Sequence, residues 1–139
     1  MQIANFGAVF EAALNLERRL VSRYQAQAAN QPGAAASLYR ELAQDGAKRL
    51  KRLERVRRET VTEMILEAIN DLYLSDDLAS LADVGDAAPL PPEAARDLER
   101  SASRFYAEAA EKIGLDEAAR ALRRLGKENA KRADRLAAL

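Results

Sequence analysis

Residues 16–24 read LERRLVSRY, and residues 98–106 read LERSASRFY. In each stretch a Leu-Glu pair is followed by a tyrosine, which stands seven residues after the glutamate. Seven residues are about two turns of α-helix, so the glutamate and the tyrosine lie on one face. Two copies of this spacing indicate an internal duplication.

The repeat continues on both sides of a predicted turn. Ala28 corresponds to Ala110 with the same offset as the glutamates. The second part of each half matches with an offset that is one residue larger, which a turn can absorb: Leu42 with Leu125, Arg49 with Arg132, and Leu53 with Leu136. The chain therefore consists of two helical hairpins built on one pattern.

Apolar residues recur at alternating steps of three and four, the period of an amphipathic helix. This spacing predicts four helices, over residues 5–29, 34–72, 91–112 and 116–139. Asp116 is the expected N-cap of the last helix. The segment 73–90 is rich in Asp, Ala and Ser, and we expect it to be a longer crossover with a short helical turn at residues 78–81.

The composition agrees with an all-α fold. The chain has 139 residues, the size of one domain, and only 5% are aromatic, which is low for a sheet protein. We therefore predict a single domain over residues 1–139, an antiparallel four-helix bundle made of two related helical hairpins joined by a longer crossover.

Charge and residue usage exclude several classes of function. Lys+Arg and Asp+Glu both total 22, so no global field attracts nucleic acid, and we interpret the basic run 48–58 as a solvated helix face. Cysteine and histidine are absent, which removes thiolate sites, the commonest metal ligand and the commonest general base. The N-terminus has no signal-peptide pattern and no stretch is long and apolar enough for a membrane span, so we expect a cytoplasmic protein.

The duplicated pattern resembles the rubrerythrin-like branch of the ferritin-like superfamily, over roughly residues 5–70 and 91–139. In that family two helices each carry a single Glu followed by Tyr or an aromatic pair, and the other two each carry Glu-x-x-His. The resemblance implies a ferritin-like bundle in which Glu17 and Glu99 hold the single-Glu positions. Tyr24 and Tyr106, the latter preceded by Phe105, are their companion aromatics.

The sequence departs from the family at the other four ligand positions. Gly46 and Asn129 stand where the family has Glu, and Arg49 and Arg132 stand where it has His. Arginine is a fixed cation with no lone pair for a metal. We therefore expect no metal, no cofactor and no catalytic residue, which undermines the iron-dependent activities of the family.

A remodelled metal site is the competing hypothesis. Asp45 and Glu128 lie one residue before the lost positions, about 100° around the helix. Together with Glu17 and Glu99 they would form an oxygen-only site, of the kind that hard cations accept. In that case the protein is a divergent rubrerythrin-type metal-dependent oxidoreductase.

The main hypothesis for the former ligand layer is an ion-pair cluster. Arg49 and Arg132 point inward and pair with Glu17 and Glu99, while Asn129 satisfies the remaining hydrogen bonds. Gly46 lies inside a helix and leaves space for a guanidinium, and its replacement by Ala stabilises the protein if a methyl fits. The alternatives are that the glutamates are exposed helix charges and that the arginines extend to the surface.

These residues predict a non-catalytic ferritin-like protein that acts as a structural or interaction module. We expect a homodimer or higher oligomer, because the second helix outruns its neighbours and presents an apolar face of Met64, Ile65, Leu66 and Ile69. The sequence does not identify a protein partner, and we expect neither nucleic-acid nor membrane binding.

Overall fold

The computed structural model describes the backbone of residues 1–64 and 67–139, and the side chains of residues 1–60 and 67–139. In this part of the chain the predicted all-helical class is confirmed. The elements, in chain order, are α1 (Phe6–Asn30), α2 (Gly33–Met64), α3 (Asp76–Ala79), the 3-10 helix η1 (Ser80–Asp83), α4 (Pro92–Lys112) and α5 (Asp116–Ala137).

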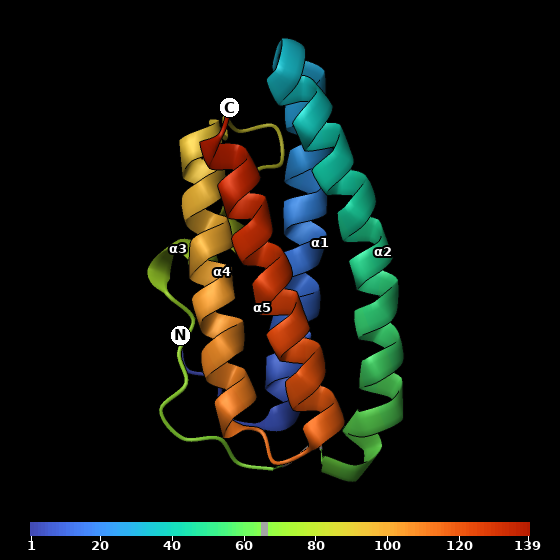
Figure 1. The fold of residues 1–139 in the computed structure, drawn as a ribbon. Helices are drawn as coiled ribbons and strands as arrows, with labels where there is room; N and C mark the ends of the chain where they lie inside the picture. The colour runs from blue at the N-terminus through green and yellow to red at the C-terminus, as the bar shows by residue number, and fades with distance from the viewer. Residues whose placement is uncertain (65–66) are drawn as a thin grey trace.

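The four long helices form two antiparallel hairpins that lie side by side (Figure 1). α1 pairs with α2 and α4 pairs with α5. α2 and α4 run in the same direction, so the segment between them crosses the length of the bundle (Figure 1). α3 and η1 lie within that crossover, which confirms the short helical turn expected there.

Local sequence signals account for most helix ends. The side chain of Asn5 caps α1 by accepting a hydrogen bond from the Ala8 amide at 2.8 Å. Gly33 begins α2 with a φ of 57°, a left-handed conformation that glycine adopts without strain. The predicted cap Asp116 is wrong: Leu115 is the N-cap of α5, and Asp116 lies in the first turn, where a carboxylate is favoured by the helix dipole.

The second helix is shorter than predicted. α2 ends at Met64, and residues 67–74 instead run beside the N-terminal segment, with hydrogen bonds from Phe6 to Glu67 and from Ile69 to Ala4. Asp71 has a φ of 58°, which a helix cannot accommodate.

The predicted apolar face at the end of the second helix is wrong for Ile69, because the helix ends before that residue. Ile69 is only 4% exposed and belongs to the core, where its amide donates to the Ala4 carbonyl of the N-terminal segment. Ile65 and Leu66 lie outside the described residues, and so does the side chain of Met64.

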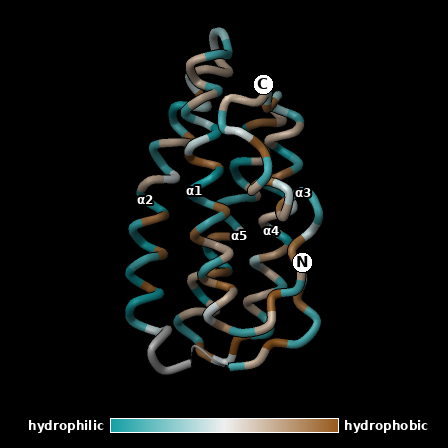
Figure 2. Tube along the Cα trace, turned by 180° about the vertical axis from the view of Figure 1, so that it is seen from behind, coloured by the Kyte–Doolittle hydropathy of each residue, from teal (hydrophilic) through white to brown (hydrophobic). Residues whose placement is uncertain are grey.

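The core runs the length of the bundle and is built from the apolar stripes of all four long helices. Hydrophobic and hydrophilic residues alternate along these helices (Figure 2). In the described part of the chain, no helix combines the length and the apolar character that crossing a bilayer requires. The interior is not wholly apolar, because a layer of charged side chains interrupts it near the middle.

Candidate functional site: a buried ion-pair cluster

The charged layer takes one side chain of each sign from each hairpin. α1 and α4 bring in Glu17 and Glu99, which are both fully buried. α2 and α5 bring in Arg49 and Arg132, which are 3% and 5% exposed. The two carboxylates and the two guanidinium groups balance in charge, which is what makes their burial tolerable.

Glu17 is held by groups from three other helices. Its Oε1 accepts a hydrogen bond from Arg49 Nε at 3.0 Å and lies 3.5 Å from Arg132 Nη2. Its Oε2 accepts from the Tyr106 hydroxyl at 3.2 Å. The arginines and the tyrosine thus tie α1 to α2, α4 and α5.

Glu99 has a matching set of partners. Arg132 Nε lies 3.1 Å and 3.0 Å from its two oxygens. Asn129 Nδ2 donates to Oε2 at 2.8 Å, and the Tyr24 hydroxyl donates to Oε1 at 2.8 Å. Each tyrosine therefore binds the glutamate of the other hairpin, which links the two halves across the centre of the bundle.

Burial and charge shift the titration of this layer. Burial raises the pKa of Tyr24 and Tyr106 well above the ordinary value, and the adjacent carboxylates of Glu99 and Glu17 raise it further. Burial alone would lower the pKa of Arg132, but its attraction to Glu99 and Glu17 outweighs that effect, and the pKa is raised. The tyrosines are therefore neutral donors and the arginine is a permanent cation.

Gly46 lies in the interior of α2, as predicted, and is buried. A Cβ at this position would lie 2.4 Å from Val21 Cγ2 and 3.3 Å from Arg49 Nη2. The glycine therefore lets α1 approach α2 and leaves room for the guanidinium. The condition for stabilisation by Ala, room for a methyl, is not met, because the side chain of Val21 already occupies the space.

The donor set does not fit a pair of metal ions. Both glutamates accept hydrogen bonds from an arginine and a tyrosine, and Glu99 also accepts one from Asn129. The positions that should add carboxylates hold Gly46 and Asn129. The guanidinium groups of Arg49 and Arg132 bring positive charge to the place where cations would bind.

The weaker carboxylate candidates lie away from this layer. Asp45 is exposed, and Glu128 is half-buried in ion pairs with Arg52 and Arg124. Among the described residues, no three Asp or Glu side chains gather in an arrangement that could hold a metal ion.

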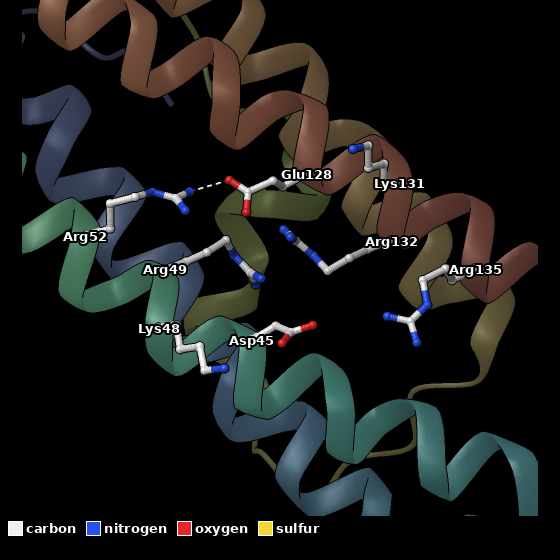
Figure 3. A pocket seen from close by; sticks show the side chains of 8 residues that line it. All are labelled: Asp45, Lys48, Arg49, Arg52, Glu128, Lys131, Arg132 and Arg135. Carbon is white, nitrogen blue, oxygen red and sulfur yellow. Dashed lines mark hydrogen bonds and ion pairs between the residues drawn. The ribbon is translucent and has the colours of Figure 1, made fainter.

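A solvent-open pocket of ≈ 330 Å³ lies between α2 and α5, directly over the cluster (Figure 3). Arg49 and Arg132 form its floor, and their guanidinium groups point into it (Figure 3). The remaining lining residues are charged as well: Asp45, Lys48, Arg52, Glu128, Lys131 and Arg135.

The basic rim of this pocket was not predicted from the sequence, in which the run 48–58 was interpreted as a solvated face. The missed signal was spacing: Lys48 and Arg52 lie four residues apart on α2, and Lys131 and Arg135 do so on α5. Residues four apart share a helix face.

Comparison of the chain with protein-family models, with curated proteins and with solved structures gave no match. The repeat is internal: one hairpin repeats the residue pattern of the other, and both contribute to the layer of buried charge.

Proposed function

We propose that this protein is a non-catalytic member of the ferritin-like superfamily, derived from the rubrerythrin-like branch, and that it acts as a structural or interaction module. The ferritin-like assignment is supported by two antiparallel hairpins and a single long crossover. It is also supported by the two glutamates, one from α1 and one from α4, at the centre of the bundle.

One observation carries the non-catalytic assignment. Arg49 and Arg132 donate to the two glutamates from the positions that hold the metal-binding histidines in the family. The arginines supply the positive charge that buried carboxylates need, so the bundle does not require a metal for its central layer.

Metal analysis separates this proposal from a remodelled oxidoreductase. The protein is purified without chelator, incubated with Fe²⁺ or Mn²⁺, desalted and analysed for metal content. We expect far less than one metal ion per chain. Near-stoichiometric iron or manganese would overturn the proposal and favour the oxidoreductase.

A matched variant shows that the assay can detect a site. Arg49→His with Arg132→His removes the two cations and adds two imidazole ligands beside Glu17 and Glu99. We expect this variant to retain more metal than the wild-type protein under identical loading.

We also propose that the module self-associates through the surface formed by the N-terminus and the crossover. Met1 and Tyr73 are 65% and 55% exposed and lie on adjacent segments, which pair through Met1 and Leu74. Exposed large apolar side chains on neighbouring segments favour an interface.

Light scattering over a wide concentration range tests the self-association. We expect a dimer or larger mass, and Tyr73→Ser should shift it toward the monomer at low concentration. A monomer mass for the wild-type protein at all concentrations would refute self-association without affecting the metal-free bundle.

A further inference from the structure

The pocket between α2 and α5 is built from duplicated residues. Its eight lining residues form four pairs, each separated by the same 83 positions that relate Arg49 to Arg132: Asp45 with Glu128, Lys48 with Lys131, Arg49 with Arg132, and Arg52 with Arg135. Both halves thus carry the pattern acidic-x-Ala-Lys-Arg-x-x-Arg. The pocket therefore has the same set of charged groups on each of its two sides.

Positive charge exceeds negative charge in and around the pocket. Six cationic side chains line it, against two carboxylates. The lining residues also form ion pairs with four residues outside the lining: Glu17, Glu41, Glu99 and Arg124. When these four are included, the region has seven cations and five anions. Lys48 and Lys131 have no ion-pair partner among the described residues.

The floor of the pocket consists of two guanidinium groups whose hydrogen bonds are not all satisfied. Nη2 of Arg49 and Nη2 of Arg132 are buried and have no hydrogen-bond partner within the described structure. Nε of each arginine donates to a glutamate, and Nη2 of Arg132 also lies 3.5 Å from Glu17 Oε1. Both guanidinium groups nevertheless line the pocket and point into it (Figure 3). A buried donor without an acceptor is costly, and an anion in the pocket would remove that cost.

We propose that this pocket binds a phosphate group, either as inorganic phosphate or as the head of a small phosphate monoester. Arg49 and Arg132 approach from two different helices, and a tetrahedral oxyanion has more oxygens to share between them than a carboxylate has. Guanidinium groups suit phosphate geometry, and the two rim lysines add charge. The net excess of two positive charges matches a phosphate dianion.

The size of the pocket leaves room for more than the anion. Its volume of ≈ 330 Å³ lies at the lower end of the range for small-molecule sites, and it opens to solvent. The proposal rests on the pocket alone and stands whether or not the protein self-associates or belongs to the ferritin-like superfamily.

Calorimetric titration tests the site directly. Inorganic phosphate and glycerol phosphate are titrated at neutral pH, with sodium chloride holding the ionic strength constant because screening weakens such contacts. We expect saturable binding of one anion per chain. Equal affinity for the two probes assigns the site to free phosphate, and tighter binding of glycerol phosphate assigns it to the monoester.

A matched pair of double variants separates the pocket from general charge. Lys48→Ala with Lys131→Ala removes the two rim lysines and leaves the buried cluster intact. Lys51→Ala with Lys127→Ala removes the same charge from exposed positions on the same helices, outside the pocket. We expect the rim variant to bind at least about tenfold more weakly, because it loses two cations that would contact the anion. The control should stay within about twofold.

Nuclear magnetic resonance of the arginine side chains provides the second readout. Phosphate should shift the side-chain signals of Arg49 and Arg132 more than those of the exposed arginines. Absence of binding by both probes, equal weakening in the two double variants, or no shift at the two floor arginines would each overturn the proposal. It would also be overturned if a short DNA duplex bound while phosphate did not, because the basic surface would then be a nucleic-acid site.

Discussion

The ion pair between Glu17 and Arg49 lends itself to a quantitative test, because its neighbours are known. Glu17→Leu leaves Arg49 buried without its carboxylate, and Arg49→Met leaves Glu17 with a hydroxyl and one distant guanidinium. Breaking a buried pair in this way costs roughly 3–5 kcal/mol. Domains of this size have about 5–15 kcal/mol of total stability, so either single variant should lose a large part of it.

The double variant Glu17→Leu with Arg49→Met should be far more stable than the sum of the two losses implies. It removes one anion and one cation, and Glu99 and Arg132 still balance each other. The cost that remains is the Tyr106 hydroxyl, which loses its acceptor and contributes about 1–3 kcal/mol. Adding Tyr106→Phe should recover most of that cost.

Urea denaturation followed by circular dichroism gives the four free energies of the cycle. We expect a coupling energy of at least about 2 kcal/mol between the two positions. Losses below about 1 kcal/mol in the single variants, or strict additivity in the double variant, would refute the reasoning. In either case the pair would not be a buried, mutually dependent one.

Three further predictions follow from individual contacts. Gly46→Ala should lower the urea midpoint, because the new methyl would lie 2.4 Å from a side-chain carbon on α1; an unchanged or raised midpoint would show that α1 can move aside. The pKa values of Tyr24 and Tyr106 are raised in the folded protein, so the folded protein keeps protons that the unfolded chain releases above about pH 10. The stability that these tyrosines contribute is therefore complete below about pH 10, and it is lost as the pH rises toward the folded pKa. Urea midpoints measured from pH 8 to pH 11 should therefore fall, and less steeply in the double Tyr→Phe variant; parallel slopes would contradict this. Gln27→Ala removes the acceptor of the buried Leu90 amide, which should exchange its hydrogen faster and cost about 1–3 kcal/mol, whereas the exposed Gln25→Ala should change neither quantity.

The sequence was most informative where a local pattern has one structural outcome. Apolar residues at steps of three and four, with Pro32-Gly33 and Pro91-Pro92 at the breaks, predict four amphipathic helices. They place all of the ends within a few residues except the C-terminal end of α2. The repeat of Leu-Glu and Tyr at the same spacing placed Glu17 and Glu99 on the inner faces of their helices, because a glutamate seven residues from a core tyrosine shares its face.

The prediction failed where one segment depends on a distant one. Ile69 and Leu72 continue the helical period of the sequence, but they form hydrogen bonds with the N-terminal segment and belong to the core. Whether this segment continues the helix or pairs with the N-terminal segment depends on residues that lie more than sixty positions away in the chain. Gly46 is a second case, since nothing local to α2 shows that Val21 fills the space beside it.

By itself, the sequence determined the helices, their amphipathic faces and the residue types that occupy the central layer, because these follow from the short-range period of the α-helix. Only the tertiary structure decided which groups meet. In the folded structure each tyrosine binds the glutamate of the other hairpin, Arg49 and Arg132 line one pocket, and the basic rim of that pocket comes from two helices. The physical reason is that contacts across the bundle depend on the relative rotation and spacing of the helices, and these are set by packing over the whole core.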